Sequence, residues 1–123
     1  MRITTVFAML SPMNQKIPYS PAIAAGPFLF VSGQLPSNLQ APIAEATHQV
    51  IDHLETILAA HDLTLADVVR VEVFLADIND LQAMNAAYQE RFNSPNPPAR
   101  QTIQAAALPK GAPLEISCIA YKN

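Results

Sequence analysis

Two helix-like segments, each followed by a strand-like segment, constrain the fold of this chain most strongly. Between residues 44 and 61 the larger apolar side chains recur at intervals of one, four, seven and eight residues, which is the stripe of an amphipathic helix. A second stripe runs through residues 79–92, where Asn79 and Asp80 can start a helix and Asn93 can end it. Each stripe must be buried against another layer, and the strand-like segments supply that layer.

The strand-like segments are rich in apolar and β-branched residues, and they cover residues 27–32, 68–75, 100–107 and 113–121. The run from Thr4 to Met9 is a further candidate strand. The resulting order β, β, α, β, α, β, β contains two crossovers, which in their usual right-handed form place both helices on one face of a mixed sheet. The other face then needs a different cover.

The composition suggests that another subunit covers this face, and it limits the classes of partner that the protein can bind. The 123 residues suit one domain over 1–123, and 14% are charged, against about 25% in a typical soluble domain. This shortage suggests that surface is buried in an oligomer. A net charge of −3 with scattered Lys and Arg argues against a nucleic-acid partner. A lone cysteine, Cys118, permits no intrachain disulfide, which favours a cytoplasmic protein, and neither a signal peptide nor a membrane span is expected.

Two charges stand at or inside segments that are otherwise apolar. Arg100 follows Pro98 and Ala99 at the start of a strand, and Glu115 lies within the run from Leu114 to Ala120. An ionised side chain withdrawn from water costs several kcal/mol unless it finds a partner. Arginine holds carboxylates in a bidentate fork, and a carboxylate can orient or activate water. Together they suggest chemistry on a small carboxylic acid.

The spacing of these two charges raises a geometric question. In a tight hairpin of the last two strands centred near residues 109–111, Arg100 would lie opposite about Tyr121, roughly 17 Å from Glu115 at ~3.3 Å per residue. That distance is too long for shared chemistry. Three alternatives remain: the two residues act separately, the final strand inserts elsewhere in the sheet, or different subunits bring them together.

Other polar residues are weaker candidates on position alone. Asn85 lies on the apolar side of the second helix, as a satisfied core amide or as a ligand contact. Ser32 and Gly33 end a strand, where a hydroxyl and a backbone N–H can meet a ligand, although a plain turn is the commoner explanation. Tyr19, in a proline-rich loop, is more often a packing residue.

The sequence favours no metal or organic cofactor. The three histidines are spaced by five and eight residues, which does not place an i, i+4 pair on one helical face. No phosphate-binding glycine loop, nucleophile elbow or CxxC motif occurs, and three glycines are too few for a nucleotide cradle.

Several short motifs, in order and at compatible spacing, match one family over nearly the whole chain. They are Ile17-Pro18-Tyr19-Ser20, Val31-Ser32-Gly33-Gln34-Leu35-Pro36, Val71-Glu72-Val73-Phe74-Leu75-Ala76-Asp77, Met84-Asn85-Ala86-Ala87-Tyr88, Pro98-Ala99-Arg100, Leu108-Pro109-Lys110 and Leu114-Glu115-Ile116. On these motifs the chain resembles the RidA (YjgF) family of enamine/imine deaminases.

The resemblance implies an α+β, chorismate-mutase-like fold, in which the last strand lies between the first long strand and the strand after the first helix. It also implies a homotrimer with clefts at the subunit interfaces. Arg100 would bind the substrate carboxylate, and Glu115 would position the attacking water. The remaining matched positions line the cleft: Tyr19, Ser32, Gly33, Asn85 and Thr102, the last where some members have cysteine.

The implied reaction is hydrolysis of 2-imino acids, such as 2-iminobutanoate and 2-iminopropanoate, to 2-oxo acids and ammonia without a cofactor. These imines are tautomers of the enamines released by PLP-dependent dehydratases. Two alternatives stay open. One is a trimer that binds small 2-oxo carboxylates without turnover, and the other is the ribonuclease activity attached to some relatives, against which the acidic pI of about 5.4 argues.

Overall fold

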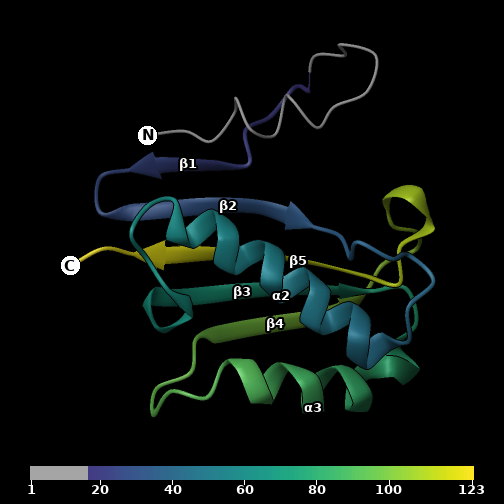
Figure 1. The fold of residues 1–123 in the computed structure, drawn as a ribbon. Helices are drawn as coiled ribbons and strands as arrows, with labels where there is room; N and C mark the ends of the chain where they lie inside the picture. Colours follow the sequence, from purple (N-terminus) through teal and green to yellow (C-terminus); the bar gives the residue numbers. More distant parts are fainter. Residues whose placement is uncertain (1–16) are drawn as a thin grey trace.

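The computed structural model describes residues 17–123 as one mixed sheet with two helices (Figure 1). In chain order the elements are β1 (Ala22–Ala25), β2 (Phe28–Gln34), α2 (Ile43–Ala59), the 3₁₀ turn η2 (Leu65–Asp67), β3 (Val68–Leu75), the 3₁₀ turn η3 (Ile78–Asp80), α3 (Leu81–Arg91), β4 (Ala99–Gln104), the 3₁₀ turn η4 (Pro109–Gly111) and β5 (Leu114–Tyr121). The two helices and four strands predicted from the sequence are confirmed. β1 was not predicted, and the candidate strand from Thr4 to Met9 lies outside the described residues.

The last strand, β5, occupies the centre of the sheet, whose strand order is β1-β2-β5-β3-β4. It runs antiparallel to both of its neighbours, β2 and β3, while β4 pairs parallel with β3 at the edge. The last two strands therefore form no hairpin with each other, and the insertion expected for the chorismate-mutase-like fold is confirmed. β4 also ends at Gln104, three residues earlier than the range 100–107.

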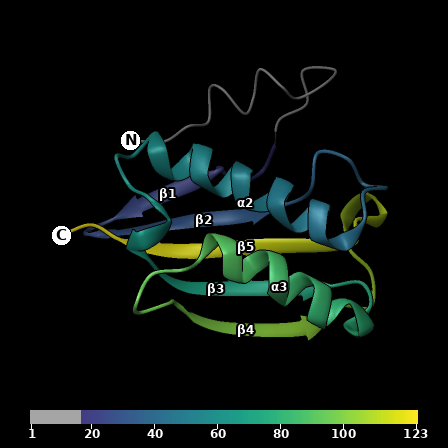
Figure 2. The same ribbon diagram turned by 60° about the horizontal axis from the view of Figure 1, so that its bottom comes forward.

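Both helices lie on the same face of the sheet, as the two views in Figures 1 and 2 show. Alternate residues of β5 point to this face and are buried, because successive side chains of a strand point to opposite sides. They meet the buried stripe of α2 and the buried valines of β3. This core consists mainly of aliphatic side chains, among them Val50, Ile51, Leu54, Leu58, Val71, Val73, Leu114 and Ile116.

Polar contacts join the two helices at their exposed edge. The guanidinium of Arg91, near the end of α3, donates to the carboxylates of Asp52 at 2.7 Å and Glu55 at 2.6 Å on α2. It also donates to the His48 carbonyl at 3.2 Å. Since these partners lie one turn apart on α2, Arg91 fixes the position of α3 and hence of the side chains that α3 presents to β4.

The opposite face of the sheet carries no helix of the described chain (Figure 2). This face exposes large aromatic side chains. Phe28, Phe30 and Tyr121 are 40%, 46% and 39% exposed. Phe28 and Tyr121 meet edge to face with ring centroids 5.2 Å apart. Exposed apolar clusters of this kind usually mark interaction surfaces. Cover of this open face by another subunit remains a prediction.

We expect Ile116→Ala, at the centre of β5, to lower the free energy of unfolding by about 2–5 kcal/mol, because it leaves a cavity in the core. Ile116 is fully buried, whereas Ile78 in η3 is 42% exposed. Ile78→Ala is therefore the matched control, with an expected loss below about 1 kcal/mol. Urea unfolding monitored by circular dichroism measures both; equal losses would contradict the central position of β5.

Candidate functional site

Arg100 projects from β4 toward α3. In the parallel ladder it pairs with Val71, whose buried side chain lies on the helix-covered face. Paired residues of neighbouring strands point to the same side, so Arg100 also faces the helices. Its guanidinium carbon lies 4.7 Å from the ring centroid of Tyr88 on α3. Arg100 is thus placed at the sheet edge, in the angle between β4 and α3.

The guanidinium of Arg100 has no ionic partner within residues 17–123, unlike the other two arginines of this region. Arg70 pairs with Glu72 at 2.7 Å, and Arg91 pairs with two carboxylates of α2. A half-buried arginine keeps its planar set of N–H donors available when no carboxylate of its own chain engages it. These donors suit a ligand carboxylate.

Three buried polar atoms near Arg100 find no hydrogen-bond partner in the described part of the chain. They are Asn85 Oδ1 and Tyr88 OH on α3, and Thr102 Oγ1 on β4. Thr102 lies two residues beyond Arg100 and so on the same face of the strand. Native proteins leave few such atoms unsatisfied, and clusters of them point to a functional site or to bound water. The unsatisfied oxygen favours the ligand-contact interpretation of Asn85 over the satisfied core amide.

An open groove of about 610 Å³ adjoins Arg100. Its walls come from α3 and the loop that leads to β4, and they consist of Asn85, Tyr88, Gln89, Phe92, Asn93, Ser94 and Pro97. Burial raises the pKa of Tyr88 to about 12, although nearby Arg100 lowers it. The phenol therefore stays neutral at physiological pH.

Glu115 lies on the open face of the sheet, where Phe74 of β3 is its ladder partner and Gly33 of β2 is its neighbour. A Cβ atom at Gly33 would come within 2.8 Å of the Glu115 carboxyl carbon, so a larger residue there would displace the carboxylate from this position. Burial raises the pKa of Glu115 above its ordinary value of 4.5. The site therefore holds a partly desolvated carboxylate, which is a better proton acceptor than a hydrated one.

Ser32, which precedes Gly33 in β2, holds the loop that carries Tyr19. The Ser32 hydroxyl donates to the Ser20 carbonyl at 2.6 Å, and its backbone N–H donates to the Pro21 carbonyl at 2.9 Å. Both bonds fix the loop against the end of β2, next to Gly33. Tyr19 itself is 54% exposed. Ser32 thus positions this loop, and Tyr19 lies at the surface on the β2 side of the sheet.

The predicted site residues therefore form two groups on opposite faces of one sheet. The Arg100 group also contains Asn85 and Thr102, and the Glu115 group contains Gly33 and the adjacent Ser32. Tyr19 lies in the loop that Ser32 holds. Arg100 aligns through Val71 with Cys118, which is three residues from Glu115. Two strand spacings and three residues give about 14 Å between the Cα atoms, and the odd number places the side chains on opposite faces. One chain alone does not bring the two charges together.

Sequence reasoning missed the ring of Tyr88 and the groove that begins beside it. Tyr88 lies one turn after Asn85 on the apolar stripe of α3, so its position predicted a core residue. The available signal was its spacing from Asn85, which had already been singled out as a possible ligand contact. The sequence could not show that Arg100 lies against this ring, because that contact depends on the parallel register of β4 with β3.

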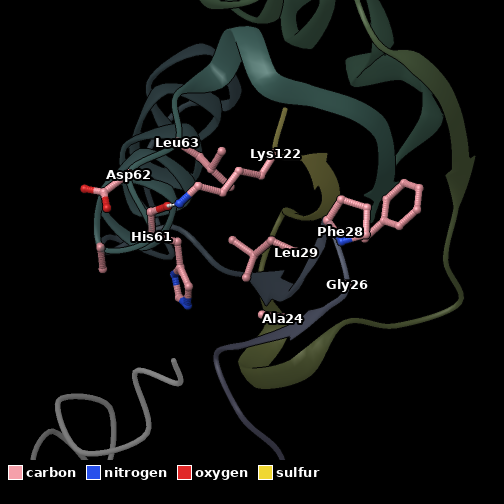
Figure 3. A pocket seen from close by; sticks show the side chains of 10 residues that line it. Ala24, Gly26, Phe28, Leu29, His61, Asp62, Leu63 and Lys122 are labelled. Carbon is pink, nitrogen blue, oxygen red and sulfur yellow. Dashed lines mark hydrogen bonds between the residues drawn. The ribbon is translucent and has the colours of Figure 1, made fainter.

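A second hollow, of about 300 Å³, lies at the end of β5 between α2 and the turn joining β1 to β2 (Figure 3). Leu29 and Leu63 contribute to its wall, and the Lys122 ammonium donates to the His61 carbonyl at 3.4 Å. It contains none of the predicted site residues and, among the described residues, no buried polar atom without a partner. The groove beside Arg100 is therefore the stronger candidate.

The described residues offer no ready metal site. Within 17–123, no three His, Cys, Asp or Glu side chains gather in a way that could hold an ion. The histidines have other contacts: His53 bonds the Ser37 hydroxyl at 2.8 Å, and His61 Nδ1 lies 3.2 Å from the Ile57 carbonyl. In this same part of the chain, neither helix has the length and apolar character needed to cross a membrane.

Known proteins match this chain along most of its length. Residues 10–122 match the family described as Endoribonuclease L-PSP. A RutC family protein of Pyrococcus horikoshii is 41% identical over 112 residues, covering 86% of this chain and 88% of that protein. The crystal structure of the YjgF gene product of E. coli superposes with a TM-score of 0.81 at 32% identity, covering 86% and 89% of the two chains. E. coli TdcF gives 0.82 at 28% identity, with 89% and 91% covered.

These matches agree with the fold described above, since both structures superpose on most of this chain with TM-scores of 0.81 and 0.82. They also agree with the resemblance seen in the sequence motifs. The chain belongs to the Endoribonuclease L-PSP family, the family of the YjgF, RidA and RutC proteins.

Proposed function

We propose that this protein hydrolyses small 2-imino acids, such as 2-iminobutanoate and 2-iminopropanoate, to 2-oxo acids and ammonia. The observation that carries this proposal is Arg100, a half-buried guanidinium with no ionic partner in the described chain, beside three unsatisfied buried polar atoms. A bidentate arginine recognises a carboxylate by shape as well as charge. Every 2-imino acid carries such a group next to its reactive carbon.

The second element of the proposal is the desolvated carboxylate of Glu115. As water attacks the imine carbon, Glu115 accepts one of its protons while the C–O bond forms. Glu115 then returns this proton to the nitrogen. As the C–N bond breaks and ammonia leaves, Glu115 removes the remaining hydroxyl proton so that the C=O bond of the 2-oxo acid forms, and ammonia takes up that proton as ammonium. A protonated imine is already electrophilic, so fixing its carboxylate and one water supplies much of the catalysis.

Two subunits complete the site in this proposal. Arg100 and Glu115 lie on opposite faces about 14 Å apart at their Cα atoms, so a single chain cannot place both on one substrate. A neighbouring copy that covers the open face with its own β4 edge would bring its Arg100 toward Glu115. The exposed Phe28, Phe30 and Tyr121 give that face an apolar surface to bury. A closed ring of three such contacts forms the homotrimer expected from the family resemblance.

The ligand of a related structure and the description of the family both bear on the choice of substrate. The crystal structure of E. coli TdcF contains bound serine, which has a carboxylate beside a nitrogen-bearing carbon. Such a ligand is close in size and charge to a 2-imino acid. The family description names an endoribonuclease, yet this chain has a net charge of −3, which disfavours the phosphate backbone of RNA. Small carboxylates are therefore the better supported ligands.

The direct test follows the decay of 2-iminobutanoate generated in situ by threonine dehydratase. We expect wild-type protein to accelerate decay, and Arg100→Ala to raise KM by at least about thirtyfold through loss of charge-assisted hydrogen bonds. Arg100→Lys keeps the charge without the fork and should fall between the two. If wild-type protein binds 2-oxobutanoate in a calorimeter but does not accelerate decay, the non-catalytic carboxylate-binding function replaces this proposal.

Subunit mixing tests the shared site. Arg100→Ala and Glu115→Gln homotrimers should each be nearly inactive. After unfolding and refolding together in equal amounts, they should recover about a quarter of wild-type activity, because each mixed ring of three contains one intact Arg100–Glu115 interface. Refolding each variant alone is the control. No recovery in trimers shown to be mixed would contradict a site built across subunits.

The raised pKa of Glu115 gives a stability prediction with a definite sign. A folded-state pKa above the ordinary 4.5 means that the folded protein holds this proton more tightly than the unfolded chain. The contribution of Glu115 to stability therefore falls as the pH rises from about 4.5 through the higher pKa of the folded state. Measured in Arg100→Ala protein, so that no neighbouring guanidinium lowers the Glu115 pKa, Glu115→Gln should raise the melting temperature at pH 7, and the difference should vanish at pH 4 and below. Calorimetric melting between pH 3.5 and 8 measures it; a lower melting temperature for Glu115→Gln at pH 7 would contradict the desolvated carboxylate.

A further inference from the structure

Arg100 is held by one described contact, the ring of Tyr88. The guanidinium carbon lies 4.7 Å from the ring centroid, a distance typical of a cation–π interaction. Behind Tyr88 the ring of Phe92 is stacked at 4.5 Å with an interplanar angle of 24°. Arg100, Tyr88 and Phe92 therefore form a layered stack between β4 and α3.

The stack is rigid on the side away from Arg100. Tyr88 and Phe92 are only 7% and 6% exposed, and both belong to the main hydrophobic core. Arg91, the last residue of α3, is tied to α2 by its two carboxylate partners. The ring of Tyr88 therefore has a fixed place, whereas Arg100 has a long side chain with no ionic partner in the described chain.

We propose that Tyr88 is a positioning residue for the substrate carboxylate, acting through Arg100 and not by contact with the reacting atoms. The aromatic face restricts the guanidinium plane before the ligand arrives, so less rotamer freedom is lost on binding. This inference rests on the proposed carboxylate clamp. It adds a residue that neither the sequence motifs nor the family resemblance singled out as functional.

The phenolic oxygen helps to separate this role from direct binding. Tyr88 OH is buried and has no partner among residues 17–123, so it contributes no described contact that orients Arg100. The ring alone carries the proposed function. Phenylalanine retains the ring, and leucine removes it while keeping an apolar side chain in the core.

The test compares Tyr88→Phe and Tyr88→Leu in the assembled protein, using KM and kcat for 2-iminobutanoate and the calorimetric Kd for 2-oxobutanoate. We expect Tyr88→Phe to stay within about twofold of wild type, because the π face remains. Tyr88→Leu should raise both KM and Kd about tenfold. In contrast, kcat should change by less than about threefold, since the water and Glu115 are untouched.

Met84→Ala controls for a general loosening of α3, because Met84 is fully buried on the same helix and has no recorded contact with Arg100. Its KM and Kd should stay near the wild-type values. An equal rise in Met84→Ala, or an unchanged Kd in Tyr88→Leu, would overturn the positioning role. A tenfold rise in Tyr88→Phe would also overturn it, because the hydroxyl would then carry the effect.

The calorimetric arm keeps this inference separate from the proposed reaction. If wild-type protein binds 2-oxobutanoate without hydrolysing imines, the deaminase proposal fails while the Kd values of the Tyr88 variants still decide the role of the ring. If wild-type protein binds no small carboxylate, both proposals fail together.

Discussion

The placement of β5 between β2 and β3 is the constraint on which the rest of this structure depends. It makes β5 the central strand, so its alternation of apolar and polar residues has to serve both faces of the sheet. One set of side chains completes the core beneath α2. The other set includes Glu115 and is directed to the open face, next to Gly33 of β2. Had β5 paired with β4 instead, Glu115 would have lost the glycine that permits its close packing.

The same sheet separates the two charges that carry the chemical argument. Arg100 lies at the β4 edge under α3, where helix packing supplies an aromatic ring and several buried polar atoms. Glu115 lies on the uncovered face, where partial burial raises its pKa. The two halves therefore differ in environment, one rigid and lined by buried polar groups, the other holding a partly desolvated carboxylate. In the proposed trimer, association through the apolar open face would bring the two halves together.

Much of the fold could be predicted from residues alone, because the helices have clear apolar stripes and the strands have clear alternation. β1 was missed, since four residues, Ala22–Ala25, give too short a pattern. The end of β4 was also misplaced, because Ala105 to Ala107 continue the composition of the strand without continuing its pairing. In the site, the charges of Arg100 and Glu115 were conspicuous in apolar surroundings. Tyr88 was not, because an aromatic residue on a helical stripe is indistinguishable from ordinary core.

The sequence by itself determined both helices, four of the five strands, the helix-covered face and the two unusual charges, since each depends on local periodicity or on the cost of burying an ion. Tertiary structure decided which strands are neighbours, and hence that Arg100 lies against Tyr88 and Glu115 against Gly33. These contacts join residues twelve to more than eighty positions apart. Strand pairing over such separations depends on the packing of the whole chain, because every strand offers the same backbone N–H and C=O groups, which carry no information about the partner.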